Sequence, residues 1–210
     1  MRDRPLTATL RPTLVDGARL GPASAQAAPA RDASVDELAM AATAGDAEAV
    51  GRLYDELVDP IHRYVAMRLR RREDAEDVTQ LVFERIVAAL PRYRHNGKPF
   101  AAWAFRIARN AVIDHQRRLR PTEPLGAIAE PADGMIVEAL SLRDEEIREL
   151  RAAIRALTPD QQEALALRYG AGLSAEEAAR VMGRQAGTVR GLTFRAIEAL
   201  RRNLAREAGA

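Results

Sequence analysis

Residues 174–204 read SAEEAARVMGRQAGTVRGLTFRAIEALRRNL, and their pattern predicts the fold of the second half of the chain. It opens with Ser174 and, three residues later, Glu177, which is the capping-box pattern that starts a helix. The pattern predicts a short helix ending at Met182, a glycine-containing turn over residues 183–185 and a longer helix after it. Short helix, tight turn and longer basic helix together are the signature of a helix-turn-helix.

The longer helix has one apolar face and one basic face. Helical spacing turns Val189, Leu192, Ala196, Leu200 and Leu204 inward. The outward positions are Arg190, Gly191, Phe194, Arg195, Arg201 and Arg202. Guanidinium groups bind guanine through two hydrogen bonds, and an apolar ring can contact the methyl group of thymine. An ordinary solvated helix also carries outward arginines, but it needs neither the turn nor an exposed ring, so the pattern favours DNA binding in the major groove.

Composition divides the rest of the chain into a second domain, a linker, a first domain and a tail. The motif belongs to a second domain over residues 137–206, in which Thr158-Pro159 starts a helix that turns Leu165 and Tyr169 to one face. Residues 120–136 hold three prolines, two glycines and no helical period, which predicts a linker. Residues 1–33 hold four prolines and no helical period, which predicts a disordered tail.

Residues 34–119 form a first domain of helices. Order is expected to begin at Ser34, which forms a second capping box with Glu37, and a new helix is expected at Pro60. A further helix starts near Glu73 and another opens at Pro99. The inward positions of the last helix are predicted to be Phe100, Trp103, Ile107 and Ala111. The predicted fold class is therefore all-α, with two small helical domains joined by a flexible linker.

Basic and aromatic residues are concentrated in residues 92–120, which hold eight basic groups and a single acidic one, Asp114. Such a block suits single-stranded nucleic acid, because charge follows the backbone and rings stack on bases. The alternative is that the rings belong to the core, and we prefer it for Phe100 and Trp103. Tyr93, which falls in the loop, is the better candidate for stacking. The outward face of the helix carries Arg106, Arg109, Asn110, Ile113 and Arg117.

The composition argues against several other classes of protein. The 210 residues include no cysteine, so disulfides and thiolate chemistry are excluded. The acidic residues near Glu73 are best explained as partners of a helix N-terminus, and the three histidines show no ligand spacing, so no metal and no cofactor are expected. No apolar run approaches the ~18 residues of a membrane span, which predicts an intracellular, cytoplasmic protein. No nucleophile–base pair or phosphate loop is evident, which disfavours an enzyme.

Two segments in this order resemble the sigma factors of bacterial RNA polymerase, specifically the extracytoplasmic-function (ECF) type that keeps only regions 2 and 4. REDAEDVTQLVFERIVAALPRYRHNGKPFAAWAFRIARNAVIDHQRR resembles region 2, and ALTPDQQEALALRYGAGLSAEEAARVMGRQAGTVRGLTFRAIEALRR resembles region 4. The resemblance covers roughly residues 36–204. Residue 81 is leucine where the family usually has glutamate, and residues 191 and 192 are glycine and leucine where serine and arginine are common.

The resemblance implies a role for each segment. Asp77, Gln80 and Leu81 would lie where region 2 docks on the β′ clamp of core RNA polymerase. The residues implied in opening the promoter −10 element and holding its single strand are Tyr93, Arg94, His95, Asn96, Arg106, Asn110, Asp114 and Arg117. Those implied in reading the duplex −35 element are Thr188, Arg190, Phe194 and Arg195. The other face of region 4 would meet the polymerase β flap, and an anti-sigma factor is a candidate partner.

The leading hypothesis is therefore a sigma factor that binds core polymerase, recognises the −35 and −10 elements and promotes −10 melting. The alternative is a helix-turn-helix regulator that binds duplex DNA without core polymerase. The basic and aromatic block of residues 92–120 separates the two, because a sensory domain has no reason to carry it. Neither hypothesis includes covalent chemistry.

Overall fold

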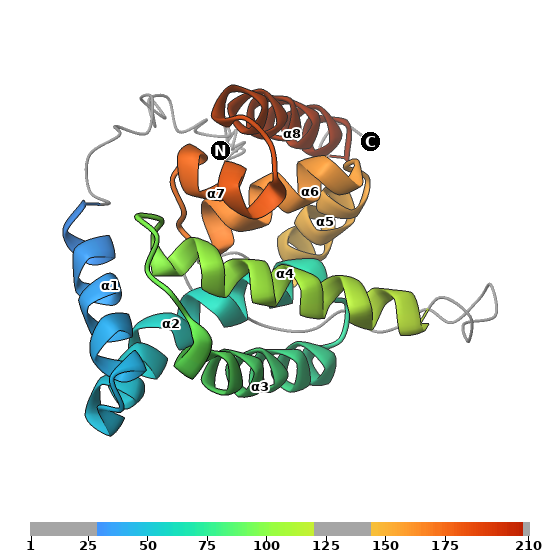
Figure 1. The fold of residues 1–210 in the computed structure, drawn as a ribbon. Helices are drawn as coiled ribbons and strands as arrows, with labels where there is room; N and C mark the ends of the chain where they lie inside the picture. Colours follow the sequence, from blue (N-terminus) through green and yellow to red (C-terminus); the bar gives the residue numbers. More distant parts are fainter. Residues whose placement is uncertain (1–28, 120–143, 208–210) are drawn as a thin grey trace, which may run out of the picture.

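The structure, a computed structural model, describes residues 29–119 and 144–207, and every regular element in those ranges is helical (Figure 1). The first half holds α1 (Pro29–Thr43), α2 (Ala47–Arg68), α3 (Arg72–Ala89), the 3-10 turn η1 (Leu90–Arg92) and α4 (Phe100–Leu119). The second half holds α5 (Asp144–Arg155), α6 (Pro159–Leu165), the π-helical turn η2 (Ala166–Gly170), α7 (Ala175–Met182) and α8 (Ala186–Glu207). The all-α prediction is confirmed.

The first helix begins earlier than expected. α1 starts at Pro29, a residue suited to a first helical turn, so Ser34 lies inside the helix and not at its N-cap. Residues 29–33, which we assigned to the tail, are helical, and Val35 and Leu38 follow them into the core. Residues 1–28 of the predicted tail and the predicted linker, residues 120–136, lie outside the described residues.

The helix break expected at Pro60 does not occur, because α2 runs through it without interruption. A proline inside a helix removes the hydrogen bond to the carbonyl four residues earlier. The apolar stripe of α2 is buried on both sides of the proline, at Leu53, Leu57, Ile61, Tyr64 and Val65. Burial of one continuous stripe compensates for the missing bond, which is why the local signal at Pro60 is overridden.

α4 is covered on two sides, which widens its buried face beyond the prediction. Phe100 and Ala111 are buried as expected, whereas Trp103 and Ile107 are only half-buried. The additional buried positions are Ala101, Ala102, Ala104, Phe105, Ala108 and Val112. Figure 1 shows the reason: α4 lies between α3 on one side and the second half of the chain on the other.

The second half forms the expected helix-turn-helix. Ser174 caps α7 through a complete capping box with Glu177, and Gly183, with φ of 65°, ends α7 in the left-handed conformation that glycine tolerates best. One inward prediction is wrong, because Tyr169 is exposed while Leu165 is buried. The wider π turn of η2 separates these residues, so the spacing of four expected of an α-helix no longer places them on one face.

The two halves share one continuous core. Tyr64 and Phe105 of the first half belong to the same cluster of buried side chains as Leu167 and Val181 of the second half. Around this core, α7 packs on α4 and η2 packs on α2 (Figure 1). The regions that flank the predicted linker are therefore in contact with each other in this structure.

Candidate nucleic-acid and protein-binding sites

α8 presents an exposed face suited to DNA. Val189, Leu192 and Ala196 are buried, as their spacing predicts, and the hydroxyl of Thr193 donates to the carbonyl of Val189 at 2.9 Å. The predicted contact residues Thr188, Arg190, Phe194 and Arg195 are all exposed. Phe194 is 66% exposed, the largest value among the described large apolar side chains, and exposure of a phenyl ring on a basic helix is unexplained by folding alone.

Acidic residues engage part of this basic face. Arg190 donates a hydrogen bond to Glu176 of α7, and Arg184 in the turn lies 3.3 Å from Asp160 of α6. Within the described ranges, no acidic side chain pairs with Arg195. Because exposed pairs of this kind contribute ~0–1 kcal/mol, they orient arginines without preventing them from exchanging a carboxylate for a base.

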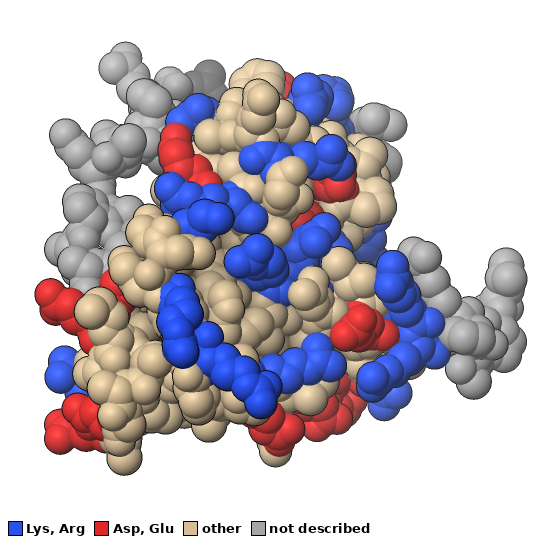
Figure 2. All heavy atoms as spheres, viewed as in Figure 1, with Lys and Arg blue, Asp and Glu red and all other residues tan. Residues whose placement is uncertain are grey.

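A basic cavity lies beside the N-terminal end of α4. Its volume is about 310 Å³, and its lining residues are Arg92, Tyr93, Arg94, Asn96, Lys98, Pro99, Ala102, Trp103, Arg106 and Arg180. Nine of them come from the first half, and Arg180 comes from α7. Figure 2 shows Lys and Arg side chains gathered over the face formed by α4 and the adjoining second half. The size lies at the lower end of small-molecule sites, and the lining combines cations with an indole ring.

Tyr93 does not have the exposure that stacking on a base requires. The turn η1 folds it back onto α4, where it is 8% exposed and its ring centroid lies 5.0 Å from those of Phe100 and Trp103. Burial and the nearby Asp36 raise the pKa of the Tyr93 hydroxyl. Tyr93 therefore forms part of the wall of the basic cavity, and the half-buried Trp103 is the most exposed of the three rings.

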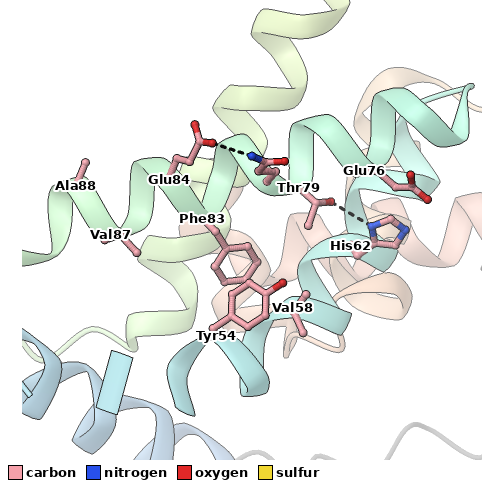
Figure 3. A pocket seen from close by; sticks show the side chains of 10 residues that line it. Tyr54, Val58, His62, Glu76, Thr79, Phe83, Glu84, Val87 and Ala88 are labelled. Atoms are coloured by element: carbon pink, nitrogen blue, oxygen red, sulfur yellow. Dashed lines mark hydrogen bonds between the residues drawn. The ribbon is translucent and has the colours of Figure 1, made fainter. Parts of the chain in front are cut away.

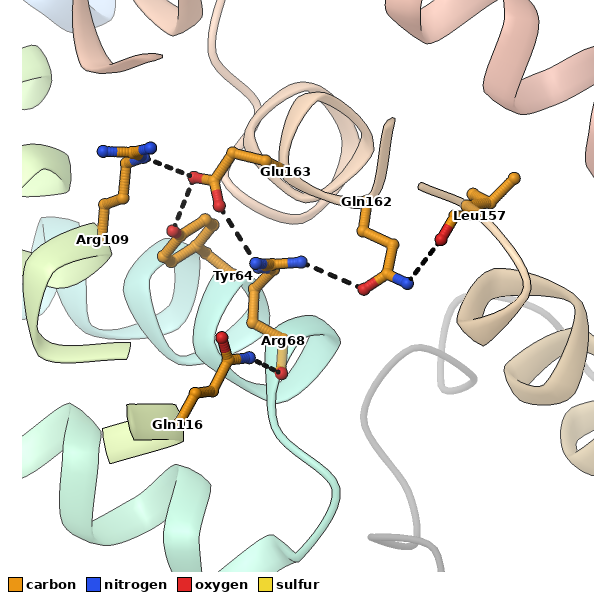
Figure 4. Close-up of polar contacts among 7 residues, drawn as sticks. All are labelled: Tyr64, Arg68, Arg109, Gln116, Leu157, Gln162 and Glu163. Atoms are coloured by element: carbon orange, nitrogen blue, oxygen red, sulfur yellow. Dashed lines mark hydrogen bonds and ion pairs between the residues drawn. The ribbon is translucent and has the colours of Figure 1, made fainter. Parts of the chain in front are cut away.

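Some of the remaining residues predicted for the −10 strand are exposed, and others form ion pairs within the protein. Arg94, His95, Asn96, Arg106, Asn110 and Arg117 are exposed. Asp114 is engaged with Arg85 of α3 at 3.3 Å. Arg109, which we placed on the same outward face, is instead paired with Glu163 of the second half at 3.6 Å (Figure 4).

Of the ten residues that line the basic cavity, only Tyr93, Arg94, Asn96 and Arg106 were predicted contact residues. Trp103 and Arg180 are two of those that the sequence did not assign to this site. Trp103 was assigned to the core, although its position one helical turn before Arg106 is a signal that it borders the basic face. The sequence around Arg180 gives no sign of this position, because the packing of α7 on α4 is a contact between distant parts of the chain.

A separate groove lies between α2 and α3 (Figure 3). Its volume is about 810 Å³, and it is lined by Tyr54, Val58, His62, Glu76, Thr79, Gln80, Phe83, Glu84, Val87 and Ala88. Apolar side chains form its floor, since the rings of Tyr54 and Phe83 lie 4.6 Å apart, and Tyr54 and Val87 are about half exposed. An exposed apolar groove rimmed by polar groups is typical of a protein-binding surface.

Of the three residues predicted to contact core polymerase, only Gln80 lines this groove, where its amide donates to Glu84 at 3.1 Å. Asp77 is exposed and Leu81 is half-buried, and neither lines it. At one end of the groove, His62 Nδ1 lies 3.2 Å from the hydroxyl of Thr79. Burial lowers the pKa of His62, so the neutral imidazole is favoured there.

Two further features are absent from the described part of the chain. Residues 29–119 and 144–207 contain no group of three or more side chains placed to hold a metal ion. Among the same residues, no helix is both long enough and apolar enough to cross a membrane.

Comparison with known proteins gives matches over both halves. The family model of sigma-70 region 2 matches residues 53–122, and that of sigma-70 region 4 matches residues 147–200. The chain is 38% identical over 186 residues to the ECF RNA polymerase sigma factor BldN of Streptomyces coelicolor, covering 85% of this chain and 69% of the relative. It is 32% identical over 180 residues to the ECF sigma factor SigD of Mycobacterium tuberculosis, covering 80% and 82%.

The fold is also found in a solved structure. The sigma factor RpoE of Bartonella quintana, determined in complex with the anti-sigma factor NepR, superposes with a TM-score of 0.62 at 22% identity over 74% of this chain and 96% of that one. The basic cavity, the groove between α2 and α3 and the exposed face of α8 all fall within the matched regions 2 and 4. The chain therefore belongs to the ECF family of RNA polymerase sigma factors.

Proposed function

We propose that this protein binds core RNA polymerase and directs transcription from promoters that carry its −35 and −10 elements, promoting melting of the latter. The observation that carries the proposal is the presence, in one sigma-type chain, of two basic surfaces of different kinds and an apolar groove. One surface is an exposed recognition helix, and the other is a cavity with an aromatic wall. A helix-turn-helix regulator acting without polymerase would need only the first, so this alternative is not favoured.

In this function, α8 reads the −35 duplex. Arg190 and Arg195 bind base edges, Phe194 contacts a thymine methyl group and Thr188 contacts the backbone at the start of the helix. The exposure of all four side chains supports this assignment.

The basic cavity and the outward face of α4 take the −10 strand. Arg94, Asn96 and Arg106 line the cavity and supply charge and hydrogen bonds, and Trp103 supplies the stacking surface. The strand then continues beside the cavity along the exposed residues His95, Asn110 and Arg117. Tyr93 packs against Trp103, and Asp114 links α4 to α3 through its ion pair with Arg85.

The groove between α2 and α3 docks on the β′ clamp of core polymerase. Gln80 contributes from its rim, with Asp77 and Leu81 on neighbouring surface of α3. The second half meets the β flap. The protein works in the cytoplasm with the polymerase, uses no metal or cofactor and catalyses no reaction itself, and an anti-sigma factor that restrains it is an expected partner.

The direct test is to add the purified protein to core polymerase and sequence the transcripts made from fragments of the genome of its own organism. Initiation at a defined set of promoters with shared elements supports the proposal. Binding of those fragments without core polymerase, and no change in transcription start sites when core polymerase is present, would support the regulator instead.

Replacing Arg190 or Arg195 by alanine is expected to weaken binding to the −35 element by ~1–3 kcal/mol each, because each guanidinium makes a bidentate contact with a base. Fluorescence anisotropy of a −35 duplex, titrated with the complex of this protein and core polymerase, measures the affinity, and duplexes with single-base changes measure the sequence preference. Arg155→Ala, an exposed arginine on α5, is the matched control and leaves binding unchanged. Unaltered preference in both α8 variants would contradict the assignment.

Replacing Arg106 and Asn110 together by alanine is expected to impair −10 melting more than closed-complex binding, because contacts with an extruded base arise only after unpairing. Both side chains are exposed, so the fold is retained. Permanganate reactivity of −10 thymines, beside a gel-shift for total binding, separates the steps. A template with a pre-opened bubble restores the variant, and Arg52→Ala on α2 is the control. Equal losses in both assays, without rescue by the bubble, would exclude a melting role.

A further inference from the structure

α4 begins without a capping side chain of its own. Its first residue is Phe100, and residues 98–103 read KPFAAW, so no side chain around this start carries an oxygen atom. The first four N–H groups of a helix have no partner within the helix, and a side-chain oxygen next to the first turn commonly accepts from one of them. A side-chain partner for the start of α4 therefore has to come from another element.

Asp36 of α1 supplies this partner. Its Oδ1 atom accepts a hydrogen bond from the backbone N–H of Phe100 at 2.5 Å, although the two residues are 64 positions apart in the chain. Val35, Leu38 and Ala39 are buried, and they hold α1 against the body of the first half, where it contacts α4 (Figure 1). A carboxylate is especially favourable at this place, because the N-terminus of a helix carries partial positive charge.

The same carboxylate lies beside both ends of the loop of residues 93–99. Tyr93 begins this loop, and its ring packs edge to face on that of Phe100, which follows the loop, with the ring centroids 5.0 Å apart. Burial raises the pKa of the Tyr93 hydroxyl, and the nearby negative charge of Asp36 raises it further. α1 contacts η1 before the loop as well as α4 after it. A single residue of α1 thus touches or approaches both points that anchor the loop.

Asp36 also offsets a concentration of positive charge. Arg92, Arg94, Lys98 and Arg106 line the basic cavity beside the start of α4. These cations repel one another and the positive end of the helix, and the first turn of α4 has no acidic residue to oppose them. A carboxylate at this end lowers the free-energy cost of holding the cations together before a nucleic-acid strand binds.

We propose that Asp36 is a positioning residue for the −10 strand, which caps α4 from α1 and holds both ends of the loop of residues 93–99, so that Trp103 and the cations of the basic cavity are in place before the strand arrives. Asp36 precedes residue 53, where the match to sigma-70 region 2 begins. The cap is a property of the free protein. Only its consequence for the −10 strand rests on the proposed function.

Amide hydrogen exchange of the free, full-length protein, followed by mass spectrometry, tests the cap. Asp36→Ala removes the acceptor, whereas Asp36→Asn keeps an oxygen of the same reach without the charge. Exchange in peptides that cover residues 98–105 is expected to be about fivefold faster in Asp36→Ala and within about twofold of the wild-type rate in Asp36→Asn. Peptides of α8 are expected to exchange at the wild-type rate in both variants.

Promoter opening tests the positioning role. With core polymerase present, permanganate reactivity of the −10 thymines is expected to fall about fivefold in Asp36→Ala and to stay within about twofold of the wild-type level in Asp36→Asn. Affinity of the same complexes for a −35 duplex is expected to stay unchanged, because the contact of Asp36 is with α4 and not with α8. A general loss of stability would lower both activities together.

Glu37→Ala is the matched control, since it removes an exposed carboxylate from the same helix at a position between α1 and α2. It is expected to match the wild-type protein in both assays. Circular dichroism establishes that each variant is folded. If Asp36→Ala is not, Asp36→Ser takes its place, because the serine oxygen is one bond short of the carboxylate oxygen and does not reach the Phe100 amide.

Unchanged exchange at the start of α4 in the folded alanine or serine variant overturns the cap. Faster exchange together with normal promoter opening overturns the positioning role. A wild-type protein that opens no promoter with core polymerase counts against the proposed function instead, whereas exchange measured without polymerase or DNA still decides whether Asp36 caps α4.

Discussion

Replacing Phe105 by alanine is expected to lower the free energy of unfolding by about 3–5 kcal/mol. Phe105 is 1% exposed at the centre of the core, and its ring meets that of Tyr64 edge to face at 5.8 Å. The truncation removes buried apolar surface and leaves a cavity where α4 is covered by both halves, so little relaxation can fill it. Urea denaturation followed by circular dichroism measures the change.

Phe194→Ala is the matched control, since the same atoms are removed from a ring that is 66% exposed. We expect its free energy of unfolding to stay within ~0.5 kcal/mol of the wild-type value. Similar losses for the two variants would mean that the Phe194 ring is buried in solution, against the exposed recognition face described for α8.

Replacing Val87 by aspartate is expected to weaken binding to core polymerase by at least about 30-fold, which corresponds to the ~2 kcal/mol of an interface hot spot. Val87 is 51% exposed in the groove between α2 and α3, so the charge costs the free protein little. In the complex, the same charge would be buried against an apolar partner surface without a counter-ion. Competition for core polymerase against the labelled wild-type protein measures the loss.

Met40→Asp provides the comparison, because Met40 is 57% exposed on α1 and does not line the groove. Its affinity for core polymerase is expected to equal that of the wild-type protein. If Val87→Asp binds core polymerase normally, the docking surface lies elsewhere on α3, where Asp77 and Leu81 are the remaining candidates.

Local signals in the sequence predicted most of the helices correctly. The capping box at Ser174, the start at Thr158-Pro159 and the glycine turn at residue 183 each act through hydrogen bonds or backbone angles within a few residues. The predictions failed where distant packing decides the outcome. α2 continues through Pro60 because its apolar side chains are buried on both sides of the proline. The π turn after Leu165 changes the helical phase, so Tyr169 lies on another face than Leu165.

In the candidate sites too, local patterns predicted the exposed residues but not the contacts that the folded chain creates. Exposure of Arg190 and Phe194 follows from the helical period of α8 itself, so the sequence predicted it. Burial of Tyr93 depends on the way the turn η1 folds the chain back onto α4, and a helical period does not extend through such a turn. The pairing of Arg109 depends on Glu163, which is far along the chain.

The cluster of Tyr93, Phe100 and Trp103 also gives the protein a built-in optical reporter. Trp103 is the single tryptophan of the chain, and it lines the basic cavity. Its emission therefore reports on one place only, and a base stacked on the indole would quench it while solvent exposure would shift it to longer wavelength. Entry of a DNA strand into the cavity can thus be followed in real time on the unlabelled protein with stopped-flow mixing.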